Sequence, residues 1–222
     1  MLVLALDTAT ARITAGVVEL DADGPPTTLA ARDAEGARAH AELLAPAVAD
    51  ALAAAGRTRA DLDAVVAGLG PGPFTGLRVG LVTAAAMGDG LGIPVHGVPT
   101  HDALAAGTRG RVLVVTDARR REVYWSLLVD GVRVHGPEVV APAELAARLG
   151  PDGDLGPVDR VLGDAAAQVG AATVSPGPTP DGLVAVAAPA LRAGADPGPL
   201  VPLYLRRPDA VPPGAPKAVT RP

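Results

Sequence analysis

Residues 68–81, GLGPGPFTGLRVGL, link a predicted buried strand to a predicted helix and hold five glycines and two prolines. A glycine-rich loop at this place is typical of phosphate-binding sites, but a Walker loop requires Lys and then Ser or Thr after its last glycine. Here Leu77 and Arg78 follow Gly76. The dinucleotide-binding fingerprint fails as well, because Thr75 occupies the position of its third glycine. The loop is therefore interpreted as a rigid turn, and the Thr75 hydroxyl is expected to cap the following helix.

A stripe of small residues follows the loop at intervals of four: Gly76, Gly80, Ala84 and Gly88. Glycine in a helix interior costs about 1 kcal/mol relative to alanine, so several glycines on one helix face need a compensating contact. Two neighbours can supply it by approaching the helix backbone closely, namely the underlying sheet or a helix of a partner protein. The sequence alone leaves both interpretations open.

Outward from this stretch, short apolar runs and helical spacing predict a similar order of elements twice. In the first unit three strands, a helix, a strand, a helix and a strand are predicted at residues 2–6, 13–20, 27–32, 40–55, 62–68, 75–91 and 93–98. In the second unit three strands, a helix, a strand and a helix are predicted at residues 112–116, 122–129, 132–140, 142–149, 160–162 and 183–193.

This repeat predicts an α/β protein with a two-lobed actin-like ATPase (RNase H-like) fold, in which each lobe has the order βββαβα. We expect an N-terminal lobe over residues 1–108 and a second lobe over residues 109–207. Residues 208–222 are rich in proline and are expected to form an extended tail.

The first predicted strand of each lobe ends in an aspartate, at Asp7 and at Asp117. In actin-like ATPases a glycine-rich turn and a carboxylate at these places hold the phosphates and the metal. Here Asp7 is followed by Thr8, and neither turn contains a glycine. Side chains at such turns hinder the approach of backbone N–H groups to a phosphate. We therefore interpret Asp7, Thr8 and Asp117 as degenerate phosphate-loop positions, with the two carboxylates capping their turns.

The composition narrows the classes of function. A net charge of -5 argues against a basic nucleic-acid-binding domain, and the absence of cysteine excludes cysteine-based metal sites, nucleophiles and disulfides. The four histidines are not spaced as metal ligands, so we predict no metal and no cofactor. The apolar N-terminal run is too short for a signal peptide or a membrane span, so we expect a cytoplasmic protein that does not enter membranes.

Two arginine clusters stand out against the negative net charge. Such runs either form solvated faces or contact RNA phosphates or acidic groups of a partner; the clusters comprise Arg119, Arg120 and Arg121, and Arg206 with Arg207. The chain has only four aromatic residues, which we consider too few for a base-stacking platform: Phe74, Tyr124, Trp125 and Tyr204.

Five stretches in order along nearly the whole chain resemble the TsaB family. They are residues 4–8 (LALDT), His40 at the start of the first helix, GPGPFTGLRVG at 70–80, residues 116–125 (TDARRREVYW) and PLYLR at 202–206. The most specific stretch depends on Gly70, Pro71, Gly72, Phe74, Thr75 and Arg78. Pro73 departs from the family, which usually has serine there.

This resemblance implies a non-catalytic subunit of the bacterial machinery that makes threonylcarbamoyladenosine beside the tRNA anticodon. The implied partners are a TsaD-like paralogue, a TsaE-like ATPase and, mainly through the TsaD-like partner, tRNA; a homodimer is an alternative when the partner is absent. The resemblance implies pairing through the helices at 40–55 and 75–91, with an interface that includes His40, Leu44, Val48, Gly76, Gly80, Thr83, Ala84, Met87 and Gly88.

Two other functions fit the same architecture. One is an ATP-dependent phosphotransferase that uses Asp7 and Asp117 to position magnesium. The other is a metallopeptidase-like hydrolase, which the absence of a paired-histidine motif disfavours.

Overall fold

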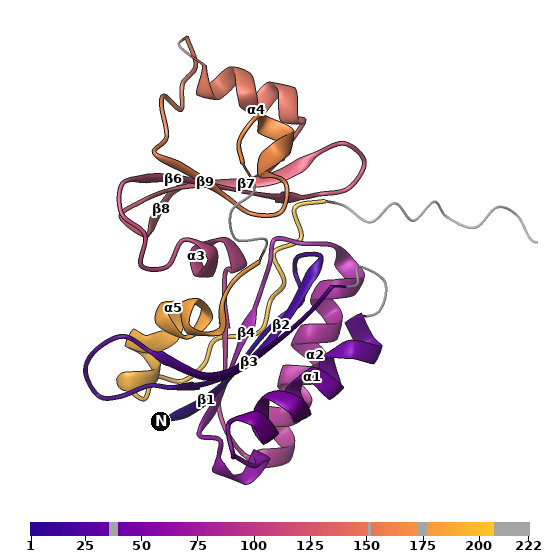
Figure 1. Cartoon of the computed structure of the whole chain (residues 1–222), viewed down its shortest axis with the longest axis vertical. Helices are drawn as coiled ribbons and strands as arrows, with labels where there is room; N and C mark the ends of the chain where they lie inside the picture. Colours follow the sequence, from indigo (N-terminus) through magenta and orange to yellow (C-terminus); the bar gives the residue numbers. More distant parts are fainter. Residues whose placement is uncertain (36–39, 151, 173–176, 207–222) are drawn as a thin grey trace, which may run out of the picture.

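Two β-sheets with helices packed on them make up the protein, and the computed structural model describes residues 1–35, 40–150, 152–172 and 177–206 (Figure 1). The first sheet has the strand order β3-β2-β1-β4-β5. Its central strand β1 pairs antiparallel with β2 and parallel with β4. The bounds are β1 (Leu2–Asp7), β2 (Arg12–Glu19), β3 (Thr27–Glu35), β4 (Ala64–Gly68) and β5 (Val95–Val98). β1 and β4 are buried throughout, as expected for strands covered on both faces.

The second sheet repeats this arrangement with four strands in the order β8-β7-β6-β9. Its first strand β6 pairs antiparallel with β7 and parallel with β9. The elements are β6 (Arg111–Asp117), β7 (Val123–Val129), β8 (Val132–Val140), α4 (Pro142–Leu149), β9 (Arg160–Leu162) and the 3-10 turn η2 (Ala166–Val169). The two-lobed α/β fold predicted from the sequence is confirmed.

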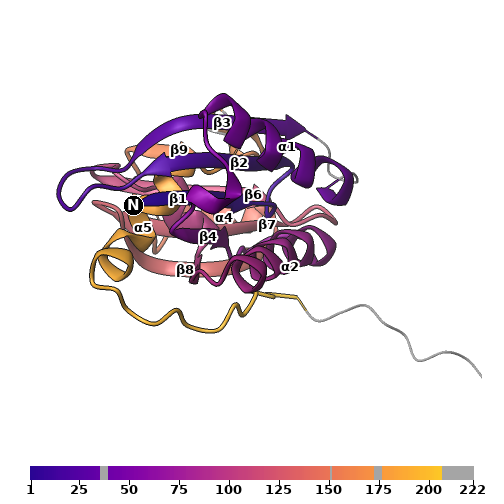
Figure 2. The same ribbon diagram turned by 90° about the horizontal axis from the view of Figure 1, so that it is seen from below.

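Two long helices cover one face of the first sheet, as Figures 1 and 2 show. They are α1 (His40–Ala54) and α2 (Phe74–Leu91), and a short 3-10 turn, η1 (Arg59–Asp61), lies between them along the chain. Leu44 and Val48 of α1 and Leu81 of α2 pack into one core with Leu4 and Leu6 of β1. None of the helices in the described ranges has the length and apolarity needed to cross a bilayer.

The last helix lies elsewhere than the sequence predicts. We expected the helix near residues 183–193 in the second lobe, but α5 (Pro180–Arg192) packs on the face of the first sheet opposite α1 and α2 (Figure 1). Leu183 and Val184 are buried there against Val3 of β1 and Val66 of β4. The pattern of an amphipathic helix shows that one face is buried but not which sheet buries it.

Helix α3 (Thr100–Leu104) joins the two lobes. Its buried His101 contacts two hydroxyls of the second sheet, with Nδ1 2.8 Å from Ser126 Oγ and Nε2 2.9 Å from Thr116 Oγ1. Burial, together with the charge of Arg133, lowers the pKa of the His101 imidazole to about 3. A neutral imidazole, held by a hydroxyl at each nitrogen, therefore fixes the junction.

A segment without helical or strand periodicity runs back from α5 along α2, and we name residues 193–206 the C-terminal strap (Figure 2). Leu203 N donates to Leu69 O at 2.8 Å, and Leu200 packs against the core beneath α2. The Tyr204 ring lies 5.0 Å from that of Phe74. The predicted tail at 208–222 is outside the described residues.

Candidate functional site

Asp7 is the last residue of β1, directly before the turn to β2, and its side chain is only 1% exposed. Thr100 Oγ1 donates to its Oδ2 at 2.6 Å, and Ala9 N donates to its Oδ1 at 2.8 Å. Burial raises the pKa of Asp7 to about 6, although both hydrogen bonds oppose the shift. The carboxylate therefore connects the turn to α3.

The same turn is also closed by α2, on the side where a phosphate loop needs open backbone. Thr8 Oγ1 donates to Gly76 O at 2.7 Å and accepts from Gly80 N at 3.1 Å. A Cβ added to Gly72 would overlap the carbonyl of Ala9, so the two turns are in backbone contact. Glycine at this position serves the approach of one protein turn to another.

The second carboxylate, Asp117, ends β6 and caps its own turn. Arg119 N donates to Asp117 Oδ1 at 3.1 Å, and the Arg119 guanidinium lies 3.5 Å from Oδ2. Asp117 N in turn donates to Asp164 Oδ1 at 2.9 Å. The contacts of the Asp117 side chain with Arg119 are local, as expected for a turn-capping aspartate.

An asparagine at position 7 tests this structural role of the carboxylate. Because burial raises the folded-state pKa from 3.8 to about 6, the protonated form is favoured in the folded protein, and this contribution is complete below pH 3.8 and lost as the pH rises through 6. Asp7→Asn stays neutral at every pH. Relative to the parent chain, its free energy of unfolding is expected to rise by about 2 kcal/mol between pH 4 and pH 8. Urea denaturation at both pH values measures this, and an unchanged difference would contradict it.

The small-residue stripe of α2 packs on the first sheet. Gly76, Gly80, Ala84 and Gly88 are all buried, and a Cβ added to Gly80 would overlap Thr8 Oγ1 while one added to Gly88 would overlap Val95. All four positions are buried within the chain, with Thr8 of the turn after β1 against Gly80 and Val95 of β5 against Gly88, so the structure does not support their assignment to a partner interface.

Leu44 and Val48 of α1, which were assigned to the same interface, are likewise buried in the core beneath the helix. The side chain of His40 is outside the described residues. The two other predicted positions, Thr83 and Met87, lie at the outer side of α2.

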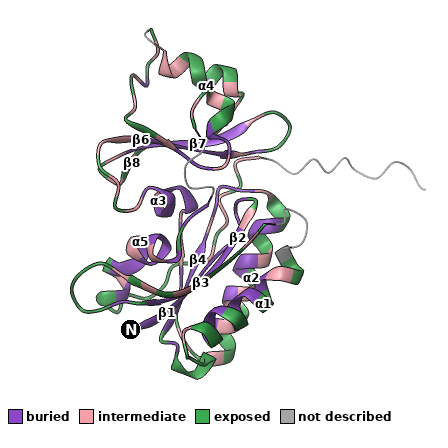
Figure 3. Cartoon of the chain, viewed as in Figure 1, coloured by how far each residue is buried: buried purple, intermediate pink, exposed green. Residues whose placement is uncertain are grey.

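The outer side of α2 is exposed or partly exposed (Figure 3), and several of its residues are apolar. Val82 is 66% exposed. A shallow groove of about 460 Å³ runs beside it, lined by Arg59, Val82, Thr83, Ala86, Met87, Gly90 and Leu91. We name these residues the α2 outer face.

The turn that precedes α2 differs in one respect from its prediction. Helix α2 begins at Phe74 with Pro73 as its N-cap, and no side chain caps it, so the predicted capping by Thr75 is wrong. The turn is instead fixed by Thr100, whose Oγ1 accepts from Gly70 N at 3.1 Å. Pro71 is buried within the same turn. Beyond the turn, the Arg78 guanidinium lies 4.0 Å above the Phe74 ring and its Nε donates to the Tyr204 hydroxyl at 3.2 Å.

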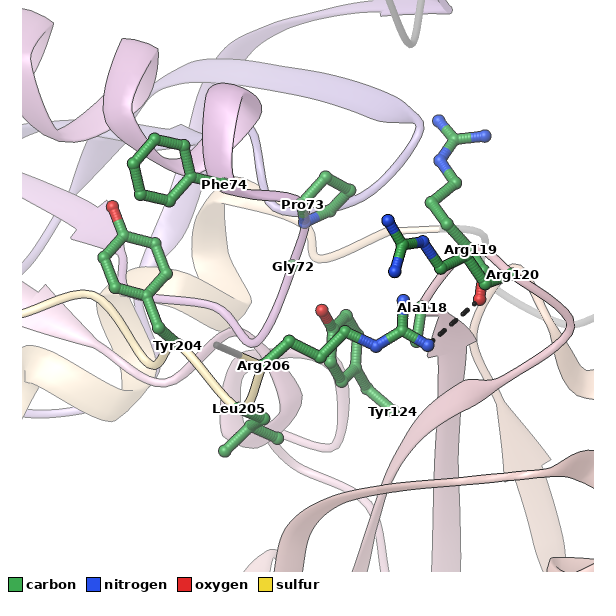
Figure 4. A pocket seen from close by; sticks show the side chains of 10 residues that line it. All are labelled: Gly72, Pro73, Phe74, Ala118, Arg119, Arg120, Tyr124, Tyr204, Leu205 and Arg206. Carbon is green, nitrogen blue, oxygen red and sulfur yellow. Dashed lines mark hydrogen bonds between the residues drawn. The ribbon is translucent and has the colours of Figure 1, made fainter. Parts of the chain in front are cut away.

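A cleft of about 350 Å³ lies between the turn before α2, the β6–β7 turn and the end of the C-terminal strap (Figure 4). We name it the arginine–aromatic cleft, and its lining comprises Gly72, Pro73, Phe74, Ala118, Arg119, Arg120, Tyr124, Tyr204, Leu205 and Arg206. Contacts with RNA or a partner were predicted from the sequence for the arginines of this cleft. The sequence did not predict that Phe74, Tyr124 and Tyr204 line the same cleft.

Among the described residues, no three His, Asp or Glu side chains are grouped so that they could hold a metal ion. Asp7 and Asp117 each have partners within their own lobe or at α3, as described above.

Sequence comparisons with known proteins identify the family to which the chain belongs. The sequence model of the family described as "TsaD: tRNA N6-adenosine threonylcarbamoyltransferase" matches residues 34–163 of the 222-residue chain. The Escherichia coli K12 protein named "tRNA threonylcarbamoyladenosine biosynthesis protein TsaB" is 37% identical over 131 residues, which cover 57% of this chain and 54% of that protein. The chain belongs to the TsaB family.

Two further similarities extend over almost the full length of this TsaB-family chain. An uncharacterized protein of Mycobacterium tuberculosis H37Rv is 52% identical over 213 residues, covering 95% of this chain and 94% of the relative. The solved structure of YeaZ from Pseudomonas aeruginosa is 26% identical and superposes with a TM-score of 0.70, covering 92% of this chain and 99% of that one.

Proposed function

We propose that this TsaB-family chain takes part in tRNA threonylcarbamoyladenosine biosynthesis as a non-catalytic subunit that pairs with a TsaD-like transferase. The name of the Escherichia coli relative supports the pathway, and the TsaD family match supports a paralogous partner of related fold. The single observation that carries the non-catalytic role is the closure of the β1–β2 turn by α2 and α3. Its Thr8 hydroxyl and Asp7 carboxylate, which a nucleotide site needs, are hydrogen-bonded within the protein.

A phosphotransferase of this fold needs Asp7 to be ionised and accessible to a metal-bound phosphate. Here burial disfavours the ionised form, and Thr100 and Ala9 occupy the carboxylate oxygens. The same interactions stabilise the turn that positions α2. The residues inherited from a nucleotide-binding fold therefore act in this proposal as the support for an interaction helix.

For the partner interface we propose the α2 outer face in place of the buried stripe. Val82 and Ala86 are exposed there in the part of the chain that the structure describes, and the groove beside them is lined mainly by small or apolar side chains. Helices of a related lobe can pack on such a surface by ridges-into-grooves contacts. A TsaE-like ATPase would join the pair formed with the TsaD-like partner. In the absence of that partner, the same face would support a homodimer.

The proposal is tested by a drop-out reconstitution. Purified TsaC-, TsaD- and TsaE-like proteins, tRNA, threonine, bicarbonate and ATP are combined with and without this chain, and threonylcarbamoyladenosine is measured by mass spectrometry. We expect product only when the chain is present. Equal product without it would contradict the proposed role.

A variant carrying both Asp7→Asn and Asp117→Asn distinguishes a structural role of the two carboxylates from a role in positioning magnesium for phosphoryl transfer. Because both side chains act structurally in this proposal, the variant is expected to support at least half of the parent activity. A loss of 100-fold or more in a variant that still folds and still binds the partner would instead favour the phosphotransferase, in which these carboxylates position magnesium.

A further inference from the structure

The arginine–aromatic cleft gathers most of the aromatic side chains of a chain that has very few. The sequence contains one Phe, two Tyr and one Trp, and three of these four, Phe74, Tyr124 and Tyr204, line this single cleft. The fourth, Trp125, is fully buried in the second lobe. Because the three residues come from α2, β7 and the C-terminal strap, the cleft exists only in the folded protein.

The cleft is also rich in arginine, although the chain as a whole has a net charge of -5. Arg119, Arg120 and Arg206 line it, and no carboxylate is among its lining residues. Outside the lining, Asp117 pairs with Arg119, and Glu122 pairs with Arg206. Figure 4 shows Arg119 and Arg120 on one side, the Phe74 and Tyr204 rings on the other, and Arg206 and Tyr124 between them. Cationic and flat apolar surfaces therefore face each other across one opening.

Both sides of the cleft are fixed before any ligand enters. The Phe74 and Tyr204 rings are inclined at 30° with centroids 5.0 Å apart, and Arg78 contacts both. On the opposite side, Arg206 donates to Arg119 O at 3.3 Å and forms an ion pair with Glu122. Preorganised groups of this kind lose little conformational entropy when they bind.

The β6–β7 turn is held in an unusual backbone conformation. Arg119, Arg120 and Arg121 have φ values of 61°, 54° and 62°, in the left-handed region that side chains other than glycine rarely adopt. Two hydrogen bonds stabilise the turn, from Ala118 N to Glu122 O at 3.0 Å and from Glu122 N to Arg119 O at 3.0 Å. Such conformations are maintained at ligand-binding sites more often than elsewhere. Here the turn presents Arg119 and Arg120 to the cleft.

We infer that the arginine–aromatic cleft binds a phosphorylated nucleotide unit. Guanidinium groups recognise phosphate oxygens by two parallel hydrogen bonds, which suits Arg119 and Arg120. An exposed aromatic pair offers a surface on which a base can stack, which suits Tyr204 and Phe74. The volume of about 350 Å³ is at the lower end of the range for small-molecule pockets, and it accommodates one nucleotide.

This ligand chemistry has two sources, a nucleotide within a single-stranded RNA segment and a free mononucleotide. The site differs from the degenerate phosphate-loop positions, because neither Asp7 nor Asp117 lines the cleft. The inference does not rest on the function proposed above, since it concerns binding by the isolated chain.

The test is fluorescence anisotropy of a labelled hexa-adenosine RNA titrated with the full chain. Replacing Arg119 and Arg120 together by Glu is expected to weaken binding at least tenfold and to reduce the slope of log affinity against log salt by about 1.4. Tyr204→Ala is expected to weaken binding at least fivefold, whereas Tyr204→Phe retains it because the ring is kept. Arg160→Glu is the matched control, since Arg160 is exposed in the same lobe and does not line the cleft.

Competition distinguishes the sources. Displacement of the RNA by AMP at equal nucleotide concentration assigns the site to a free mononucleotide, and weak displacement by AMP assigns it to an RNA strand. Three results would overturn the inference. Binding could be unchanged by the arginine and tyrosine substitutions, it could be weakened as much by Arg160→Glu as by those substitutions, or hexaglutamate could displace the RNA as well as a nucleotide does. Circular dichroism and thermal unfolding of each variant verify that it is folded.

Discussion

Replacing Val82 by glutamate is expected to abolish pairing with a TsaD-like partner and to leave the chain folded. Val82 is 66% exposed on α2, so its truncation or replacement removes few contacts within the monomer. In an apolar helix–helix interface, however, the new carboxylate would be buried without a partner. An unpaired charge of this kind costs about 3–5 kcal/mol, which corresponds to a loss of roughly 150- to 5,000-fold in affinity.

The matched control is Val132→Glu. Val132 is 68% exposed but lies on β8 in the second sheet, far along the chain from α2. Isothermal titration calorimetry with the TsaD-like partner should show loss of binding for Val82→Glu and near-parent affinity for Val132→Glu. Parent affinity for Val82→Glu would place the interface on another surface, and the opposite ranking would place it on β8.

Replacing Gly80 by alanine is expected to lower the stability of the chain through a single added methyl group. A Cβ at this position overlaps the Oγ1 of Thr8, and that hydroxyl is already hydrogen-bonded to Gly80 N and Gly76 O. The methyl group therefore has to displace the helix or break the bonds of a buried hydroxyl. Overpacking of this kind costs about 1–3 kcal/mol and lowers Tm by roughly 2–12 °C in a domain of this size.

A second glycine of the same helix provides an internal control. A Cβ added to Gly90 meets nothing within 4 Å, so Gly90→Ala is expected to stabilise the chain by up to about 1 kcal/mol through helix propensity alone. Differential scanning calorimetry measures the Tm of both variants, which is expected to fall for Gly80→Ala and to rise for Gly90→Ala. Equal stabilisation by both alanines would show that the stripe is not in contact with the β1–β2 turn.

Local patterns predicted most of the fold. The continuous apolar runs of strands such as Leu2–Asp7 and Arg111–Asp117 can be read from the sequence alone, and so can the four-residue spacing of the stripe. The caps at Asp7 and Asp117 were also predictable, because an aspartate that follows a strand bonds to the backbone two residues later.

Long-range neighbours were not predictable from such patterns. The stripe has the same sequence signature whether Thr8 or a partner helix lies against Gly80, and only the fold decides between them. The arginine–aromatic cleft combines Phe74, Tyr124 and Tyr204, which are separated by 50 and 80 residues along the chain. The sequence of residues 193–206 has no periodicity from which the return of the C-terminal strap to α2 could be predicted. Its position depends on individual contacts, such as those of Leu203 with Leu69 and of Tyr204 with Phe74.

The placement of α5 has a consequence for the folding of this protein during its synthesis on the ribosome. One face of the first sheet is covered by Leu183 and Val184, which are synthesised after the whole second sheet. Translation adds about 5–20 residues per second, so the apolar side chains of β1 and β4 on that face wait for several seconds in the nascent chain. The lobe that emerges first is thus completed last, and until then its open face is a surface that chaperones can bind.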